Sequence, residues 1–304
     1  MSTAIKESKQ ARHRRIQNNL VAYSFIAPNF IGFAVFTLGP ILFAFALTFM
    51  KWNGSGAITF AGLANIKKLF ADSIFLESLK NTIIYCLGTV PLTMAFALLL
   101  AIVLNKKIFA RNFFRTVTFF PYVASLVAVA VVWNMLFNPA KGPVNMLLSL
   151  AGISEDHLPG WAADRHWAMF TVILFSTWKN MGYYMIIYLA GLQGISPSLY
   201  EAADLDGASR WQQFRYITIP QLSSTTFFVV MMLTIDCFKV YDQIYMITQG
   251  GPGTSTLVLV YHIYNTAFIS WDLGYASAIA MVLFLLVLSV TVFQFRMEKK
   301  VTLN

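Results

Sequence analysis

The chain has 304 residues, of which 58% are hydrophobic and only 12% are charged. Soluble domains carry about 25% charged residues, and half that density does not cover a water-exposed surface of this size. The composition therefore argues against a soluble enzyme or binding module and indicates an integral membrane protein. The net charge of +9 would suggest nucleic acid in a soluble protein. Here the basic residues flank apolar segments, so membrane topology explains them and no nucleic-acid partner is expected.

About 20 consecutive apolar residues cross a bilayer as a helix, and six stretches of the chain qualify. In chain order they are roughly 22–49, 82–104, 117–137, 167–192, 222–248 and 270–295. Pro28 and Pro40 are expected to bend the first stretch or shift its ends. The fifth stretch is the most polar, because it contains Asp236, Lys239 and Asp242. The sequence predicts an all-α integral membrane protein with six transmembrane helices.

The distribution of lysine and arginine predicts the orientation of these helices. The two tails and the second and fourth loops carry fourteen basic residues, whereas the opposite side carries six. Basic residues concentrate on the cytoplasmic side, so both termini are expected in the cytoplasm. We divide the chain into a cytoplasmic tail (1–21), a six-helix transmembrane domain (22–295) that includes a loop at 196–220, and a second cytoplasmic tail (296–304). The expected location is the cytoplasmic membrane.

Motifs of catalysis, nucleotide binding and metal binding are absent from the sequence. There is no GxxxxGK[ST] phosphate loop, no HExxH and no GxSxG, and the four histidines are scattered. Cys86 and Cys237 lie in apolar runs and are expected to be small buried hydrophobic residues. We therefore predict no catalytic residue, no metal site and no cofactor in this chain.

The stretch EAADLDGASRWQQFRYITIP, from Glu201 to Pro220, is a polar module between two apolar segments. Ser196 and Pro197 predict the start of a short helix, and Gly207 its end. Ser209 with Gln212 three residues later predicts a capping box and a second helix. Pro220 is expected to mark the join to the fifth span.

Two interpretations of this module follow from geometry alone. It is either a well-capped connector or a docking surface for a partner. In the second interpretation, small side chains permit close approach and acidic side chains offer charges. The small residues are Ala202, Ala203 and Ala208, and the acidic ones are Glu201, Asp204 and Asp206.

Further motifs support the second interpretation. EAA, followed by Gly207 six residues after Glu201, resembles the cytoplasmic signature loop of permeases from binding-protein-dependent ABC importers. The DGA at 206–208 is similar to the carbohydrate-uptake branch of that family. So are SLKNTIIY, FNPAKGPVN, WKNMGYYMIIYLAGLQ and FKVYDQIYMITQGGPGTST, in that order along the chain. The FNP–GPVN and FKVYDQ stretches look more like the first of the two paired permeases.

The resemblance implies the type I ABC importer permease fold and a coupling role for the loop. In that family the loop sits in a groove of a cytoplasmic ATPase subunit. By that match Glu201 and Asp206 would be charged contacts, Ala202, Ala203 and Ala208 would allow close packing, and Gly207 would form the turn. The implied partners are a second homologous permease, two ATPase subunits that bind ATP and Mg, an extracytoplasmic solute-binding protein and the lipid bilayer.

The same resemblance implies a sugar path between the fourth and fifth spans. Family permeases that resemble this chain bind sugar from these spans near mid-membrane. The matching residues here are Asn180, Gly182, Tyr184, Thr234, Cys237 and Lys239. Lys179 and Lys239 leave open an acidic sugar or a sugar phosphate, or ion pairing within the bundle.

Two other classes of membrane protein are weighed against an importer permease. An ion-coupled secondary transporter would use Asp236, Lys239 and Asp242 as a relay, because residues three apart share a helix face. This alternative leaves the 196–220 loop unexplained. A membrane-embedded enzyme is the least favoured class, because no nucleophile–base pair or metal set is present.

Overall fold

The computed structural model of the chain describes residues 9–106 and 108–301. This part is mostly helical, and its only strands are β1 (Met50–Lys51) and β2 (Thr59–Phe60), an antiparallel pair. The N-terminal half contains α1 (Lys9–Phe33), the π-helical turn η1 (Ala34–Leu38), α2 (Gly39–Leu47), α3 (Ala64–Ala71), α4 (Ser73–Asn105), α5 (Arg111–Val123), α6 (Leu126–Leu136) and α7 (Pro143–Leu150). The short 3₁₀ turns η2 (Glu155–His157) and η3 (Trp161–Ala163) precede α8 (Ala168–Gln193).

The C-terminal part begins with α9 (Pro197–Leu205) and ends with α15 (Leu273–Val301). Between them lie α10 (Arg210–Gln213), η4 (Phe214–Thr218), α11 (Ile219–Gln221), α12 (Ser223–Phe238), α13 (Asp242–Ile247), α14 (Leu259–Tyr264) and η5 (Asn265–Ile269). The predicted N-terminal tail lies partly outside the described residues, and its positions 9–21 belong to α1.

Within the described residues, three helices are long and apolar enough to cross a membrane, at Gln17–Leu47, Ser73–Asn105 and Leu273–Glu298. Two bent pairs of helices bring the number of candidate spans to five if each pair is one span. Helix α8, at the position of the predicted fourth span, has 26 residues and would extend about 39 Å. It is more polar than these candidates, so its composition alone does not identify it as a membrane span. The six-span topology and the orientation of the termini stay predictions.

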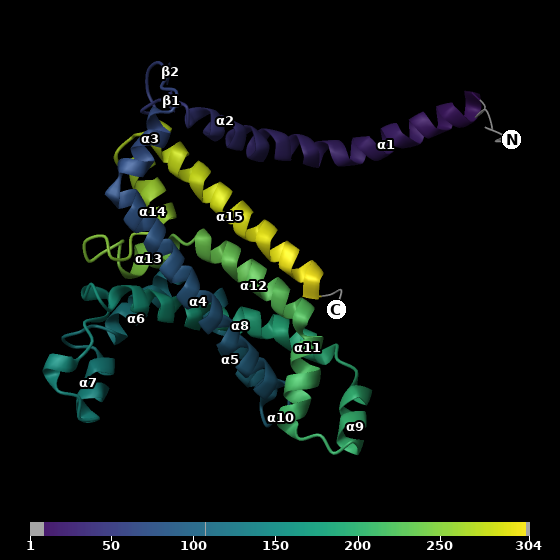
Figure 1. The fold of residues 1–304 in the computed structure, drawn as a ribbon, viewed down its shortest axis with the longest axis vertical. Coiled ribbons are helices and arrows are strands. Elements are labelled where there is room, and N and C mark those ends of the chain that lie inside the picture. Colours follow the sequence, from purple (N-terminus) through teal and green to yellow (C-terminus); the bar gives the residue numbers. More distant parts are fainter. Residues whose placement is uncertain (1–8, 107, 302–304) are drawn as a thin grey trace.

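Two predicted spans are not the single helices that their hydropathy suggests. The third contains a 99° bend between α5 and α6, near Ala124 (Figure 1). The prediction of one helix over 222–248 is wrong, because α12 ends at Phe238 and α13 starts at Asp242. Hydropathy records only how apolar a segment is, and both sides of each break are apolar enough to hide it.

Helix α8 is the centre of the packed body, where it contacts α4, α5 and α12. Its large side chains are buried on several sides, with Phe175, Met185 and Tyr188 all inaccessible to solvent. Cys86 of α4 and Cys237 of α12 lie in the same buried cluster as Phe175, as the sequence predicts for small hydrophobic residues. The central position of α8 explains how a polar helix is tolerated here, because its polar groups face protein.

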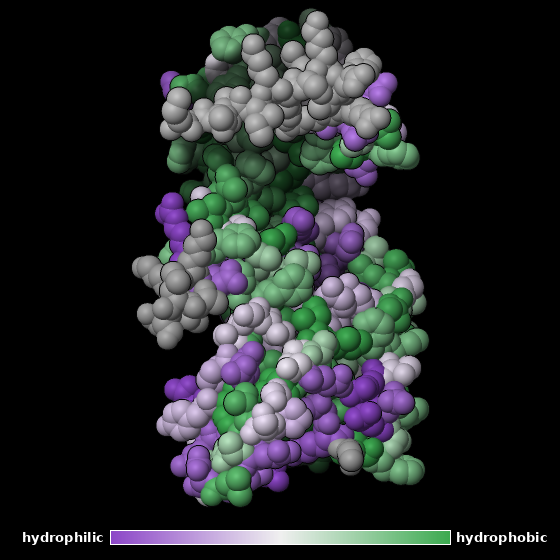
Figure 2. Space-filling view, turned by 90° about the vertical axis from the view of Figure 1, so that its right-hand side faces the viewer, coloured by the Kyte–Doolittle hydropathy of each residue, from purple (hydrophilic) through white to green (hydrophobic). Residues whose placement is uncertain are grey.

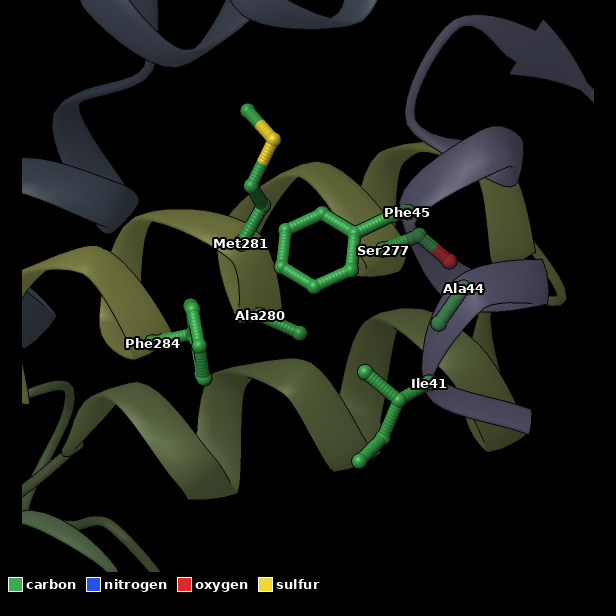
Figure 3. A pocket seen from close by; sticks show the side chains of 7 residues that line it. All are labelled: Ile41, Ala44, Phe45, Ser277, Ala280, Met281 and Phe284. Carbon is green, nitrogen blue, oxygen red and sulfur yellow. The ribbon is translucent and has the colours of Figure 1, made fainter. Parts of the chain in front are cut away.

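The N-terminal helices leave this body and extend away from it (Figure 1). Only 6% of the apolar window in 17–47 is buried, and Phe25 and Phe36 are both more than 80% exposed. The contact with the body is made by α2, where Phe45 meets Phe284 of α15 edge-on at 5.3 Å between ring centroids. An apolar pocket of about 160 Å³ remains in this seam, lined by Ile41, Ala44, Phe45, Ser277, Ala280, Met281 and Phe284 (Figure 3).

The loop before α14 is attached to the start of α4 by buried polar side chains. The Asn81 amide donates to the carbonyl oxygens of Thr254 and Leu257, at 2.8 and 3.0 Å. The Thr82 hydroxyl accepts a hydrogen bond from the Leu259 amide at 2.9 Å. Buried backbone groups need partners, so these two residues of α4 determine the path of a segment more than 170 positions later.

Replacement of Asn81 with Ala should leave the carbonyl groups of Thr254 and Leu257 unpaired. We expect a loss of about 1–3 kcal/mol of stability, because each buried acceptor keeps its desolvation cost. Thermal unfolding of the detergent-solubilised protein measures the change. Asn112→Ala, at an exposed position of α5, is the matched control and should leave the midpoint unchanged. Equal midpoints for the two variants would contradict this role of Asn81.

Candidate functional site

The 196–220 loop folds locally much as its sequence predicts. Ser196 occupies the N-cap position of α9 with Pro197 in the first turn. The Ser209 hydroxyl and the Gln212 side chain form the predicted capping box at α10. Gly207 has φ +75°, a left-handed conformation that costs glycine little. These signals act over three or four residues, so the sequence alone is enough to specify them.

Side-chain hydrogen bonds brace the two short helices against each other. The Gln213 amide donates both to the Asp204 carboxylate and to the Ala208 carbonyl oxygen. The hydroxyls of Tyr200 and Thr218 lie 2.9 Å apart. Asp204, which the sequence offers as a charge for a partner, is therefore engaged within the loop itself. The braces make the loop one preorganised unit.

The outer surface of the braced loop exposes most of the predicted coupling residues. Glu201, Ala202, Asp206 and Gly207 are exposed, and Ala203 and Ala208 are half-buried. Helices α9 and α10 lie at the lower end of the molecule, and Figure 2 shows hydrophilic residues gathered at that end, below a more hydrophobic region. Figure 1 places α9 and α10 at the end opposite the β1–β2 pair.

Large apolar side chains also protrude from the loop. Leu205 is 89% exposed, Tyr216 is 74% exposed and Trp211 is 69% exposed. Sequence reasoning missed Leu205 and Tyr216. Leu205 precedes Asp206 and Gly207 at the tip of a turn, and an apolar residue at such a tip is the signal that could have indicated it.

The join between the loop and the fifth span is not at Pro220 as predicted. Helical structure continues through Ile219 and Pro220 to Gln221, and the 63° bend follows, before Ser223. The π-helical turn at Phe214–Thr218 precedes the proline. A wider turn alters the hydrogen-bond ladder just where proline contributes no N–H, so Pro220 is accommodated without ending the helix.

Helix α8 holds the bend of the third predicted span through one lysine. The Lys179 ammonium, in a side chain that is largely buried, donates to the carbonyl oxygens of Pro121, Tyr122 and Ala124 at 2.9, 3.3 and 3.3 Å. The last carbonyls of a helix lack intrahelical partners and carry partial negative charge, so a three-donor cation fits the end of α5. Lys179 therefore caps a helix end and is not paired with a carboxylate among the described residues.

The predicted sugar-path residues divide by what they contact. The Tyr184 hydroxyl donates to the Asp236 carboxylate at 2.9 Å, which joins α8 to α12. Asn180 is half-buried on α8. Lys239 is exposed just beyond the end of α12. Cys237 is buried in the core beside Cys86, so the structure places it in packing between α4 and α12.

Gly182 and Thr234 face neighbouring helices. A Cβ on Gly182 would lie 2.1 Å from the Thr118 carbonyl oxygen, so glycine is required where α5 packs on α8. The Thr234 hydroxyl accepts from the Gln294 amide of α15 at 3.0 Å. The structure therefore brings together Tyr184 and Asp236, whereas Gly182 and Thr234 contact other elements. None of these contacts tests a role in sugar binding.

The expectation that Asp236, Lys239 and Asp242 share one helical face is wrong. It assumed an uninterrupted helix, and the chain leaves helical geometry between Phe238 and Asp242. Asp236 is instead bonded to Tyr184, and the described residues contain no ion pair among these three side chains. Across 9–106 and 108–301, no three His, Cys, Asp or Glu side chains are grouped to hold a metal ion.

Comparison with known proteins identifies the class that this fold and loop define. Residues 93–303 match the family described as the binding-protein-dependent transport system inner membrane component. The chain belongs to this family and is a membrane permease subunit of ABC transport systems.

Named relatives span nearly the whole chain. It is 37% identical to a probable ABC transporter permease protein, YurN, of Bacillus subtilis, over 93% of this chain and 97% of that protein. It is 37% identical to the lactose transport system permease protein LacF of Rhizobium radiobacter, over 89% and 91%. The sn-glycerol-3-phosphate transport system permease protein UgpA of Agrobacterium fabrum is 35% identical over 93% and 96%.

A solved structure shares the fold. It is a bacterial ABC transporter involved in the import of the acidic polysaccharide alginate, with a TM-score of 0.82 and 24% identity. The match covers 95% of this chain and 98% of that one. The type I ABC importer permease fold implied by the sequence motifs is thereby confirmed, together with the inner-membrane location of the family.

Replacement of Lys179 with Met should uncap α5, because methionine retains the apolar stem and removes three donors. We expect a loss of about 2 kcal/mol or more, since hydrogen bonds to charged groups contribute about 1.5–3 kcal/mol each. Denaturation of the purified protein in SDS measures the change. Lys179→Arg, which retains donors and charge, should recover part of it. Unchanged stability in Lys179→Met would contradict the capping role.

Replacement of Gly182 with Ala should separate α5 from α8, because the new methyl group would overlap the Thr118 backbone. Overpacking of this kind costs about 1–3 kcal/mol, so the thermal unfolding midpoint should fall. Gly32→Ala is the control, since a Cβ on Gly32 meets no atom within 4 Å. If the two substitutions have the same effect on the midpoint, the close approach of α5 to α8 does not restrict the side chain at position 182.

Proposed function

We propose that this chain is the transmembrane permease of an ATP-driven importer for a sugar or oligosaccharide. The observation that carries the proposal is the braced 196–220 loop, which presents Glu201, Asp206 and Leu205 away from the body. A connector needs no exposed leucine beside exposed acids, whereas a contact surface for a second protein uses both. The names of LacF and of the alginate transporter support a carbohydrate as the substrate class.

In this proposal the loop docks into a cytoplasmic ATPase subunit and transmits its closure. Leu205 would fill an apolar depression, and Ala202 and Ala203 would allow the surfaces to approach. The bonds from Gln213 to Asp204 and Ala208 brace the loop, so force on its tip would pass along the helical segment 210–221 and across the 63° bend to α12. The ATP and Mg would be held by the two ATPase subunits.

The exposed α1–α2 segment supports a second permease as partner. A long apolar helix that leaves its own body can extend across a neighbouring membrane chain, with lipid over its remaining surface. We propose that a homologous permease lies against it and that the two chains form the path by alternating access. Six spans with both termini in the cytoplasm belong to this proposal, and the 26-residue α8 would be the fourth span.

An extracytoplasmic binding protein would deliver the sugar to loops at the other end. The 138–166 loop is held by Asn145, whose amide donates to the Pro139 and Pro159 carbonyl oxygens and accepts from the Trp161 indole at 2.6 Å. A loop with this internal support offers a preformed surface. A second solved structure of similar fold is a bacterial alginate ABC transporter in complex with an alginate pentasaccharide-bound periplasmic protein, with a TM-score of 0.81.

The ion-coupled alternative has no comparable observation in its favour. Its relay required Asp236, Lys239 and Asp242 on one helix, and the chain breaks between them. It also leaves the exposed surface of the 196–220 loop without a purpose.

Substitution of the loop tip tests the proposal. The variants Glu201→Ala and Leu205→Ala should weaken association with the ATPase by roughly tenfold or more each, as expected for contacts at the centre of an interface. ATPase co-purification and sugar-stimulated ATP hydrolysis of the complex, produced with its genetic neighbours, measure the effect. Leu63→Ala, at an exposed leucine before α3, is the matched control.

A different set of results would contradict the importer proposal. If the wild type captures no ATPase, and the loop variants transport sugar normally without ATP while an ion gradient is maintained, the importer proposal fails.

A further inference from the structure

Four tyrosines gather where α13 and α14 meet, and we call them the tyrosine cluster: Tyr241, Tyr245, Tyr261 and Tyr264. The Tyr241 ring lies 5.7, 5.5 and 5.1 Å from the rings of the other three, in chain order. Tyr261 is 6.1 Å from Tyr245 and 6.4 Å from Tyr264. Every member therefore contacts at least two others, although they come from segments about twenty residues apart.

The backbone that carries the cluster is held in place on both sides. The Asn134 amide of α6 donates to the Met246 carbonyl oxygen of α13 at 3.2 Å. The Thr248 and Thr256 hydroxyls lie 2.7 Å apart across the intervening loop. Asn81 holds the same loop against α4. The cluster is thus preformed, so a ligand would not have to order it.

The four rings are not equally buried. Tyr261 is 8% exposed, Tyr241 and Tyr264 are half-buried, and Tyr245 is 38% exposed. Buried packing would be served as well by phenylalanine, whereas each tyrosine adds a hydroxyl. Lys239 and Asp242, both exposed, flank Tyr241 in the sequence and add charged hydrogen-bonding groups.

This combination matches the two kinds of surface on a pyranose ring. The C–H face of a sugar ring packs against aromatic rings, and its rim of hydroxyls needs hydrogen-bond partners. Ligand sites are typically lined by aromatic residues with a few polar groups in fixed positions. Tyr241 lies at the break between α12, which ends at Phe238, and α13, which starts at Asp242.

We propose that the tyrosine cluster is a receiving subsite for a sugar ring, which adjoins the sequence-predicted path at Lys239 and is separate from the other residues of that path on α8 and α12. It rests on the proposed function and adds the place where sugar first contacts this chain, on the extracytoplasmic side of the expected topology. Tyr245 is the exposed stacking surface, Tyr241 and Tyr264 lie beside it as half-buried rings, and the buried Tyr261 ring packs against the other three.

The test uses the complete transporter in lipid nanodiscs with its binding protein. A panel of glucose, galactose, lactose, maltose, raffinose, glucuronate and glucose 6-phosphate is screened for stimulation of ATP hydrolysis by the wild type. The sugar that stimulates most is then titrated against Tyr245→Leu, Tyr264→Leu and the corresponding Phe variants. Phe70→Leu, an exposed aromatic residue of α3, is the matched control.

Loss of the ring should raise the half-maximal sugar concentration roughly tenfold in the Leu variants, with the maximal rate within about twofold of the wild type. The Phe variants retain the stacking surface and should shift it by less than about threefold. The control should not shift it. Thermal unfolding midpoints close to that of the wild type exclude a folding defect, and Tyr245, as the most exposed ring, is the safest position to change.

Two results would overturn the inference, and they differ from each other. In the first result, sugar stimulates the wild type and both Leu variants keep the same half-maximal sugar concentration, or lose only maximal rate. The tyrosine cluster would then serve in side-chain packing and not in sugar binding. The proposed function would then stand. A wild type that binds its ATPase but responds to no sugar of the panel would overturn the sugar assignment and the subsite together.

Discussion

The structure depends on a buried lysine at the centre of an apolar protein. An ammonium group away from water is costly unless all its protons are bonded, and Lys179 bonds to three carbonyl oxygens at the end of α5. The same three acceptors would otherwise be unpaired at a helix end. The ammonium group and the three carbonyl groups therefore satisfy each other, and neither keeps the free-energy cost of burial without a hydrogen-bond partner. The 99° bend between α5 and α6 lies at these hydrogen bonds, which also hold α8 beside the bend.

Around this centre the chain uses polar side chains to hold irregular backbone. Asn81 and Thr82 hold the loop before α14, Asn145 holds the 138–166 loop, and Asn134 holds α13. In each case a side-chain amide or hydroxyl satisfies main-chain groups that no helix ladder pairs. Helices α4, α6 and α7 carry these supports, and the proposed sugar-binding surface lies on backbone that they hold.

The two proposed contact surfaces of the molecule are both preorganised by side-chain hydrogen bonds. At one end the 196–220 loop is braced by Gln213 and exposes Leu205 on a rigid tip. Elsewhere the tyrosine cluster is braced from α6 and α4 and exposes Tyr245. Preorganisation of this kind lowers the entropy lost on binding, which suits a protein that must engage partners repeatedly during transport.

The sequence by itself determined the membrane class, the family and the local form of the 196–220 loop. Those features rest on composition and on signals within a few residues, such as the Ser209–Gln212 capping box and the left-handed Gly207. Tertiary structure decided the breaks near Ala124 and after Phe238, the capping role of Lys179 and the exposure of Leu205. These depend on groups more than fifty positions apart or on which surface remains uncovered, and periodicity within one segment carries no information about either.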